Sequence, residues 1–260
     1  MEIELDTSKN AMQNLSLIYG RLKEAKAKRS RILEAIEQTK KIGKAQAKPS
    51  SKNASKSKFR KKKKWWDEYR SFETSNGFRV VAGKNAKQND ELYAKHLSSE
   101  DLFFHADIQG APTVILKRGE FAEETDILEC AQWAASYSSA WKSGAAAVDV
   151  YAVEKSQVSK HAQGGYIGRG AFAIEGERKW FRKTELKLKI GKSDGLVLIL
   201  PFMHEKKPEK FVGLRPGERE KEDAAKVLSA HLSCKKDEVL QLLPNGKISF
   251  DYYLELSENI

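Results

Sequence analysis

Apolar side chains recur every three or four residues along the first part of the chain. Between residues 8 and 40 this series is formed by Leu15, Ile18, Leu22, Ala25, Arg29, Ile32 and Ile36, with one basic member. The spacing predicts one helix with a narrow apolar seam, capped at its start by Asp6, Thr7 or Ser8. Such a seam is typical of a coiled-coil arm, and an amphipathic helix lying on the domain is the alternative. Gly43 and Pro49 end the pattern.

From Phe72 onward the pattern becomes that of alternating strands and helices. Strands are expected at 77–84, 101–108, 112–117, 147–154, 171–181 and 186–191, and residues 195–202 and 210–215 are expected to form a hairpin or strand pair. Helices are expected at 86–97, at 126–144 as one long element, at 218–232 and at 236–243. A short helix beginning near Phe59 would carry Trp65, Trp66 and Tyr69 toward the domain.

These elements predict an α+β fold, a mixed β-sheet domain with packed helices, preceded by a coiled-coil arm with a basic flexible tip. We expect the arm and its Lys-rich linker at residues 1–64, the main domain at 65–192 and an α/β extension at 193–260. No internal repeat is apparent.

The positive charge is concentrated in one segment. Residues 40–64 contain twelve Lys or Arg and no Asp or Glu, so removing them takes the net charge from +11 to about −1. The tract ends in five consecutive cations, Arg60, Lys61, Lys62, Lys63 and Lys64. A block with so few core-forming residues is expected to stay solvated and to meet a polyanion, and a solubilising linker is the alternative.

Composition limits the class of protein. No run approaches the roughly 18 apolar residues of a membrane span, and the acidic, polar start "MEIELDTSKN" does not resemble a secretory signal. The chain has two cysteines, Cys130 and Cys234, without CxxC spacing. A disulfide framework and a CxxC zinc site are therefore not expected, and the chain is predicted to be a cytoplasmic protein without a membrane partner.

The stretch "DLFFHADIQGAPTVILK" places His105 two residues before Asp107. Residues i and i+2 of a strand share a face, so the two side chains are expected to point the same way, opposite Phe104 and Ala106. The pair could hold a metal ion or orient a general base, but further ligands or a nucleophile are not apparent nearby. A polar pair that orients a loop or binds a ligand is the favoured interpretation.

Two loops are candidate sites for nucleic-acid phosphates. In "AGKNAKQNDE", Gly83 follows a strand and Asn85 can cap the next helix, which would leave backbone N–H groups facing an anion. In "QVSKHAQGGYIGRGAF", glycines are interleaved with Lys160, His161, Tyr166 and Arg169, so that a base could stack and a phosphate could pair. A plain strand–turn–helix joint and a glycine-rich hairpin without a ligand are the alternatives.

The ordered set of motifs resembles the RNA-binding domain of the NFACT family. These are "SFETSNGFRVVAGKNAKQNDELYAKHL", "DLFFHADIQGAPTVILK", a helix that ends "SSAW" and "QVSKHAQGGYIGRGAFAIEG", over about residues 65–192. The first 28 residues resemble the family's entry into a coiled-coil arm, and "FVGLRPGEREKEDAAKVL" resembles the tail of archaeal members. The sequence departs from the family pattern at Ser71, Ala82, Asn85 and Gly165.

The resemblance implies contact with RNA during the extension of stalled nascent chains on the large ribosomal subunit. The family's features fall on Gly83, Lys84, Gln88, Asn89, Asp101, His105, Ala106, Asp107, Gly110, Ser159, Lys160 and Gly170. The residues expected to bind RNA are Arg60 to Lys64, Arg79, Gly83, Lys84, Asn85, Gln88, Asn89, His105, Asp107, Ser159, Lys160, His161, Tyr166 and Arg169.

The functional expectation is a non-enzymatic RNA-binding module without cofactor or metal. Its expected partners are tRNA and the large ribosomal subunit, and the resemblance adds a separate NFACT amino-terminal subunit as a further candidate. Two alternatives remain open at this point. One is a protein-interaction subunit of a split factor, and the other is a metal-dependent hydrolase that uses His105 and Asp107.

Overall fold

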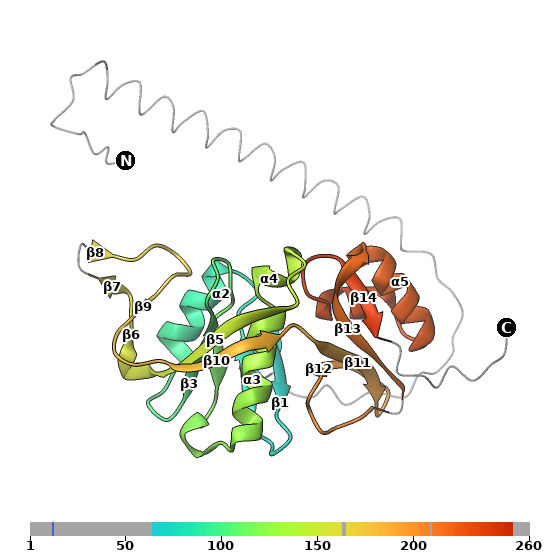
Figure 1. The fold of residues 1–260 in the computed structure, drawn as a ribbon, viewed down its shortest axis with the longest axis horizontal. Coiled ribbons are helices and arrows are strands. Elements are labelled where there is room, and N and C mark those ends of the chain that lie inside the picture. Colours follow the sequence, from blue (N-terminus) through green and yellow to red (C-terminus); the bar gives the residue numbers. More distant parts are fainter. Residues whose placement is uncertain (1–11, 13–63, 163–164, 209, 252–260) are drawn as a thin grey trace, which may run out of the picture. The chain divides into compact units, whose positions relative to one another are not determined.

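The computed structural model describes residue 12 and residues 64–162, 165–208 and 210–251. Apart from residue 12, these residues belong to one compact unit, which runs from Lys62 to the end of the chain (Figure 1). The predicted arm helix and almost all of the basic tract lie outside the described residues. Of the short helix expected near Phe59, the described part is a 3₁₀ turn, η1 (Trp65–Glu68).

The main sheet has six strands in the order β1-β2-β4-β3-β5-β10. Their bounds are β1 (Arg70–Glu73), β2 (Arg79–Ala82), β3 (Leu102–Ala106), β4 (Val114–Leu116), β5 (Ala147–Glu154) and β10 (Lys179–Glu185). Every neighbouring pair in this sheet is antiparallel, so the expectation of a mixed sheet is wrong. The short β1–β2 and β3–β4 connections explain two of these pairings, because a parallel pair needs a long crossover.

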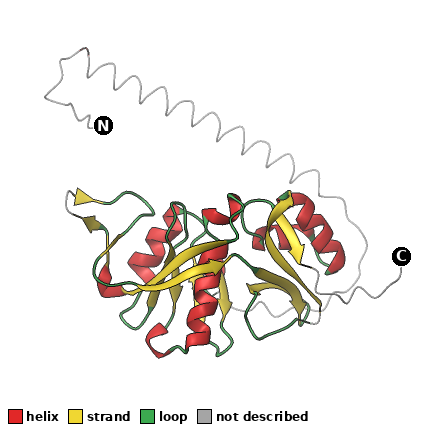
Figure 2. Cartoon of the chain, viewed as in Figure 1, coloured by secondary structure: helices red, strands yellow, loops and turns green. Residues whose placement is uncertain are grey.

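One face of the sheet is covered by α3 (Glu124–Ser136), which is followed by the short α4 (Ser139–Lys142) (Figure 2). Phe104 and Ala106 of β3 pack on this side with Trp133 and Ala134 of α3, as the alternation predicts. The single helix expected over 126–144 is interrupted. Ser138 adopts an extended conformation and its side chain accepts a hydrogen bond from the Ala140 N–H at 3.2 Å, which starts a new helix.

The opposite face carries the helical segment expected after Gly83. It consists of α2 (Ala86–Glu91) and a π-helical turn, η2 (Leu92–His96). Leu92 and Leu97 pack there with Phe103 and Tyr151 in a second apolar cluster. Two short antiparallel strand pairs follow β5, which are β6 (Val158–Ser159) with β9 (Ala173–Ile174) and β7 (His161–Ala162) with β8 (Gly165–Tyr166).

The strand expected over 171–181 is divided between β9 and β10. Gly176 lies between them with φ of +77°, a backbone conformation suited to glycine. The Gln157 side chain donates hydrogen bonds to the carbonyl oxygens of Glu175 and Glu177, at 3.0 and 2.6 Å, and holds this bend. Two further 3₁₀ turns, η3 (Gly119–Phe121) and η4 (Lys155–Gln157), connect other elements.

A second antiparallel sheet has the order β12-β11-β13-β14. It contains β11 (Leu188–Ser193), β12 (Leu196–Pro201), β13 (Lys210–Arg219) and β14 (Ile248–Asp251), with α5 (Lys221–His231) and α6 (Lys236–Leu242) beside it (Figure 1). The expected pairing of residues 195–202 with 210–215 is wrong, because Ile190 of β11 pairs with Ile199 on one side and Val212 on the other. The domain boundary expected after residue 192 falls inside β11 and stays a prediction.

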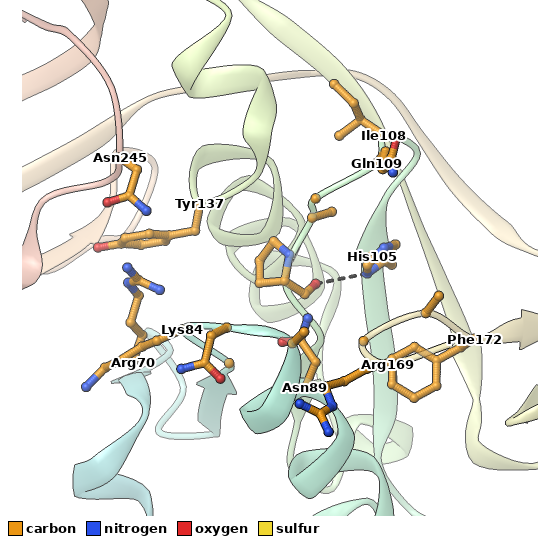
Figure 3. Close-up of a pocket in the computed structure, with 18 of the residues that line it drawn as sticks. Arg70, Lys84, Asn89, His105, Ile108, Gln109, Tyr137, Arg169, Phe172 and Asn245 are labelled. Carbon is orange, nitrogen blue, oxygen red and sulfur yellow. Dashed lines mark hydrogen bonds between the residues drawn. The ribbon is translucent and has the colours of Figure 1, made fainter. Parts of the chain in front are cut away.

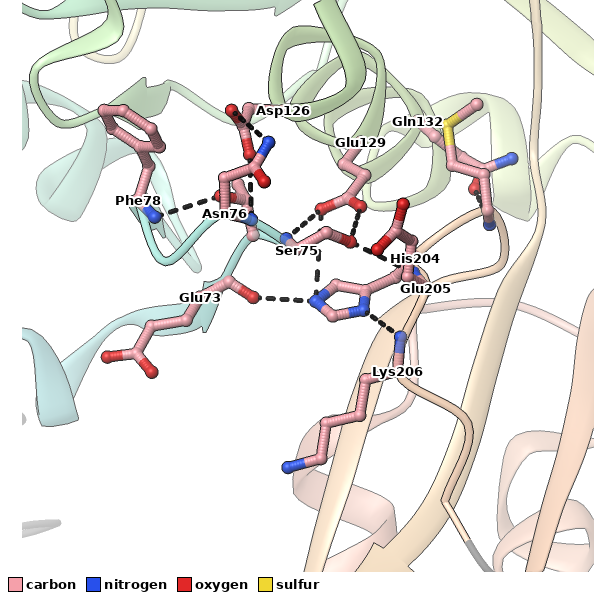
Figure 4. Close-up of polar contacts among 12 residues, drawn as sticks. Glu73, Ser75, Asn76, Phe78, Asp126, Glu129, Gln132, His204, Glu205 and Lys206 are labelled. Atoms are coloured by element: carbon pink, nitrogen blue, oxygen red, sulfur yellow. Dashed lines mark hydrogen bonds and ion pairs between the residues drawn. The ribbon is translucent and has the colours of Figure 1, made fainter. Parts of the chain in front are cut away.

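A buried polar cluster joins the loop after β12 to the first hairpin and to α3 (Figure 4). The Glu129 carboxylate accepts hydrogen bonds from the Ser75 hydroxyl and from the Ser75 N–H, the latter at 3.0 Å. Its Oε2 lies 4.0 Å from Nε2 of His204, whose ring also contacts the Glu73 carbonyl at 2.9 Å. The Ser75 hydroxyl contacts Glu129 and the Glu205 N–H rather than the imidazole, so the cluster is a structural joint and not a nucleophile–base pair.

None of the helices within the described part of the chain combines the length and the apolar character of a membrane span.

Candidate nucleic-acid interface

A cavity of about 470 Å³ opens beside the first residue of β1, the ends of β2 and β3 and the middle of β5 (Figure 3). Three cationic residues line it, Arg70, Lys84 and Arg169, and no Asp or Glu is among its described lining residues. Tyr137, Tyr151 and Phe172 contribute aromatic surface. A cavity with this lining favours an anionic ligand that carries a ring.

The loop at Gly83 is shaped by buried polar contacts within the protein. A side chain at Gly83 would overlap the amide of Asn89, which is buried and accepts a hydrogen bond from the Thr113 N–H at 3.1 Å. Asn85 caps α2, as predicted, by accepting a hydrogen bond from the Gln88 N–H at 3.0 Å. Asn89 and Asn85 therefore give the cavity its shape, and their roles in RNA binding stay predictions.

Lys84 and Gln88 attach this loop to η1. Both side chains donate to the Glu68 carbonyl oxygen, at 2.8 Å from Lys84 and 3.2 Å from Gln88. The Gln88 side-chain oxygen also accepts a hydrogen bond from the Lys84 N–H at 2.9 Å. The backbone N–H of Lys84 is thus occupied, so phosphate binding at this turn would require these contacts to rearrange.

His105 lies on the cavity wall, on the face of β3 opposite Phe104 and Ala106. Burial lowers the pKa of His105 below the usual value, and the contact with the Pro112 carbonyl and the charge of Asp107 oppose this shift only in part. A carbonyl oxygen only accepts, so Nδ1 donates to Pro112 at 3.0 Å (Figure 3). In the neutral ring Nε2 is then left as a hydrogen-bond acceptor.

Asp107 follows the last residue of β3 and its side chain is exposed. Its backbone N–H donates to the Asp149 carbonyl at 2.8 Å. Among the described residues no group of three or more His, Cys, Asp or Glu side chains is placed to hold a metal ion. Asp101, by contrast, is buried and accepts hydrogen bonds from the Ser98 and Arg118 N–H groups, at 2.7 and 2.9 Å, so its contacts are structural.

Lys160 of the glycine-rich loop is held inside the protein. Its ammonium group lies 2.5 Å from Oδ1 of Asp90, donates to the Ala171 carbonyl at 2.7 Å and lies 4.3 Å from the centre of the Phe172 ring. The same Asp90 oxygen accepts a hydrogen bond from the Gly170 N–H at 3.0 Å. Lys160 therefore fixes the position of the loop against α2.

Two predicted residues of this loop, His161 and Arg169, are exposed. Arg169 is exposed and lines the cavity, whereas His161 lies farther along the loop, in β7. The Ser159 hydroxyl accepts a hydrogen bond from the His161 N–H at 3.0 Å. The backbone of Tyr166 pairs with that of His161 in β8, and of the tract Arg60 to Lys64 the described part is Lys64 alone.

Arg70 and Tyr137 form one end of the cavity, and sequence reasoning missed both. The Arg70 guanidinium lies over the Tyr137 ring, 4.7 Å from its centre. Nε of Arg70 is buried and has no hydrogen-bond partner among the described residues. No motif marks either residue, because they come from β1 and from the end of α3 and meet only in the fold.

A row of cations on aromatic rings occupies the same side of the sheet as Tyr151. Arg178 lies 4.7 Å from the centre of the Tyr151 ring, and Arg182 lies 4.0 Å from that of Trp180. Arg79, one of the predicted residues, lies 5.0 Å from the Trp66 ring and also forms an ion pair with Glu73. Sequence reasoning missed Arg178, Trp180 and Arg182, although the basic and aromatic alternation of "RKWFRK" was a usable signal.

Comparison with known proteins identifies this domain. Residues 68–176 match the family model of the NFACT protein RNA binding domain. The chain is 40% identical over 201 residues to the archaeal Rqc2 homolog aRqcH of Methanocaldococcus jannaschii, a match that covers 74% of this chain and 30% of that protein. It is 32% identical over 127 residues to the ribosome quality control complex subunit NEMF homolog of Drosophila melanogaster, covering 48% of this chain and 13% of that protein.

A solved structure also resembles the chain. The C-terminal part of the fibronectin/fibrinogen-binding protein from Streptococcus suis is 22% identical, and the match covers 70% of this chain and 77% of that one with a TM-score of 0.40. The chain spans less than a third of the length of the two curated relatives above. The matched family is named for RNA binding and not for a catalytic activity. This agrees with the expectation of a non-enzymatic RNA-binding module. The chain therefore carries an NFACT RNA-binding domain and, over the region that matches, is a homologue of the Rqc2 and NEMF proteins.

Proposed function

We propose that the domain binds tRNA or large-subunit ribosomal RNA in the quality control of stalled nascent chains. The observation that carries the proposal is the row of cations on aromatic rings, Arg79 on Trp66, Arg178 on Tyr151 and Arg182 on Trp180. All three rings belong to the apolar cluster on the sheet face opposite α3. Aromatic planes beside cations are the combination with which proteins stack RNA bases and pair with phosphates.

The predicted residues divide into two roles in this proposal. The tract from Arg60 to Lys64 supplies affinity for phosphates through counterion release, independently of RNA sequence. The loops around the cavity fix the position and orientation of the bound RNA. The positioning residues proposed are Gly83, Lys84, Asn85, Gln88, Asn89, His105, Asp107, Ser159, Lys160, His161, Tyr166 and Arg169.

The ribosome as partner is inferred from the relatives. One of them is named as a homolog of a subunit of the ribosome quality control complex. The family model that matches residues 68–176 is named as an RNA-binding domain. Because the chain covers less than a third of these relatives, we propose ribosome association for this chain and do not extend their other properties to it.

Sedimentation with ribosomes tests the proposal. Purified chain is mixed with ribosomal subunits, separated on a density gradient and followed by immunoblot, with free tRNA as competitor in a second gradient. We expect co-migration with the large subunit, weakened by Trp180→Ala and Arg182→Gln together. The matched control is Phe121→Ala with Lys226→Gln, which removes an exposed ring and an exposed charge elsewhere on the molecule. Sedimentation only at the top of the gradient, together with no tRNA binding in a filter assay, would contradict the proposal.

A further inference from the structure

The cavity beside β1 differs in polarity between its two ends. At one end the buried Arg70 Nε has no hydrogen-bond partner among the described residues, and Asn245 stands nearby (Figure 3). The Asn245 side-chain oxygen accepts a hydrogen bond from the Lys221 ammonium group at 3.1 Å, so its amide N–H groups remain as donors. This end therefore presents the Asn245 amide N–H groups and the positive charge of Arg70, and both suit a phosphate.

The other end presents an acceptor and aromatic surface. Nδ1 of His105 donates to the Pro112 carbonyl, so Nε2 can accept a hydrogen bond from a ligand. Tyr151 and Phe172 line the cavity at this end, and the exposed Arg169 stands on the loop beside them. A base or ribose can supply the hydrogen-bond donor for His105 Nε2, because exocyclic amino groups and the 2′-hydroxyl are donors.

From these two ends we infer that the cavity holds one unpaired nucleotide of the bound RNA, with its phosphate at Arg70 and its base or ribose at His105. The cavity of about 470 Å³ lies within the size range of small-molecule sites, about 300–1,000 Å³. None of its described lining residues is a carboxylate that would repel the phosphate. The inference rests on the proposed RNA-binding function.

The surroundings of the cavity favour a nucleotide within a strand over a free mononucleotide. Tyr151, which lines the cavity, is also in edge-to-face contact with Trp180, with ring centres 5.5 Å apart. Trp180, with Arg182 over its ring and Asp149 paired to Arg182, therefore extends the aromatic and charged surface next to Tyr151. The next nucleotide of the same strand can contact this surface. A duplex keeps its bases paired and stacked inside, so the ligand has to be single-stranded at this point.

The test measures binding of the full chain to fluorescein-labelled RNA by fluorescence anisotropy. The probes are a ten-nucleotide single-stranded RNA, a duplex of the same length and uridine monophosphate as a competitor. The variants are Arg70→Gln and Arg169→Gln, with Lys226→Gln on the exposed side of α5 as the control that removes the same charge. Because Arg169 is exposed on a loop, its variant remains informative if Arg70→Gln impairs folding, which thermal unfolding would reveal.

We expect the wild-type chain to prefer the single strand to the duplex. Arg70→Gln should weaken single-strand binding by about ten- to a hundredfold and Arg169→Gln by less, while Lys226→Gln changes it by about twofold at most. Ultraviolet crosslinking followed by mass spectrometry should place a nucleotide on the peptide that contains His105, Tyr151 or Phe172. These results would support the inference.

Other outcomes overturn it in distinguishable ways. Single-strand binding that neither arginine variant alters, with crosslinks confined to other peptides, removes the nucleotide site and leaves the proposed RNA-binding function in place. If uridine monophosphate binds as tightly as the RNA, and if its binding depends on Arg70, the cavity is a site for a free nucleotide. A wild-type chain that binds no RNA overturns both the inference and the proposed function.

Discussion

The side chain of Asn89 occupies the space in which a side chain on Gly83 would lie, and its oxygen accepts the Thr113 N–H at 3.1 Å. This contact connects β2, α2 and β4 at the edge of the cavity. The glycine is required because of its neighbour, since its φ is not in the left-handed region. The Gly83 loop is therefore held by buried packing as well as by the cap at Asn85.

Gly83→Ala should destabilise the protein by about 1–3 kcal/mol, because the displaced Asn89 amide leaves the buried Thr113 N–H without its acceptor. Urea unfolding followed by circular dichroism measures the change. Gly168→Ala is the matched control, since a side chain there would meet nothing within 4 Å. Equal free energies of unfolding for the two variants would contradict the account of this loop.

Glu129→Gln should lower the stability of the joint between the two sheets. The buried Glu129 carboxylate accepts two hydrogen bonds from Ser75, and an amide in its place presents N–H groups to one of these donors. We expect a loss of about 1–3 kcal/mol, measured by thermal or chemical unfolding. Glu124→Gln, at an exposed position on the same helix, is the control and should change stability by less than about 0.5 kcal/mol. The prediction fails if both substitutions have the same effect.

Stability should fall below neutral pH because of His105. Burial holds the pKa of folded His105 below its usual value, so the unfolded chain binds the proton more readily than the folded protein does. The stabilisation is complete above about pH 6.5 and is lost as the pH falls toward the lowered pKa of the folded state. Asp107 and Tyr151 are the titratable groups facing the ring, and the Asp107 charge opposes part of the shift.

His105→Asn tests this pH dependence, because an amide can still donate to the Pro112 carbonyl but does not titrate. Unfolding free energies at pH 5.0 and 7.5 should differ less in the variant than in the wild type. Burial also lowers the pKa of His96. Because His96 is present in both proteins, it contributes equally to the pH dependence of both. An unchanged difference between the two pH values would show that His105 does not carry this effect.

Replacing Arg60 to Lys64 by five glutamines should weaken tRNA binding and reduce its salt dependence. Each lost phosphate contact lowers the slope of log K against log salt concentration by about 0.7–0.9, whatever the RNA sequence. Filter binding at several salt concentrations provides the slope. A variant with Lys235 and Lys236 replaced by glutamine serves as a control for charge outside the tract. A slope equal to that of the wild type would remove the tract from the proposed RNA-binding residues.

Trp180→Ala should reduce affinity for single-stranded RNA by about 1–3 kcal/mol, the contribution of one stacked base. Unlike the tract variant, it should leave the salt slope nearly unchanged, because no charge is lost. Phe121→Ala removes an exposed aromatic ring outside this surface and is expected to bind as the wild type does. Equal affinities of the two variants in fluorescence anisotropy would exclude Trp180 from the RNA-binding surface.

Local patterns predicted most helices and strands but not all pairings and boundaries. Alternation placed Phe104 and His105 on opposite faces of one strand, and the cap at Asn85 started the next helix where the sequence indicated. The helix break at Ser138 was missed because a short-range side-chain hydrogen bond competes with an otherwise continuous helical pattern. The position of β11 between β12 and β13 was missed because periodicity carries no information on which strands pair.

The sequence by itself determined the element types, the location of the basic tract and the motifs that resemble an RNA-binding domain. These follow from spacing and charge within short segments. Only the tertiary structure decided which residues meet, since Arg70 reaches Tyr137 and Tyr151 reaches Trp180 across distant segments. It also assigned Lys160 to an internal contact with Asp90, although its place among glycines had suggested a free cation. Side-chain partners depend on contacts across the fold, and local spacing does not encode those contacts.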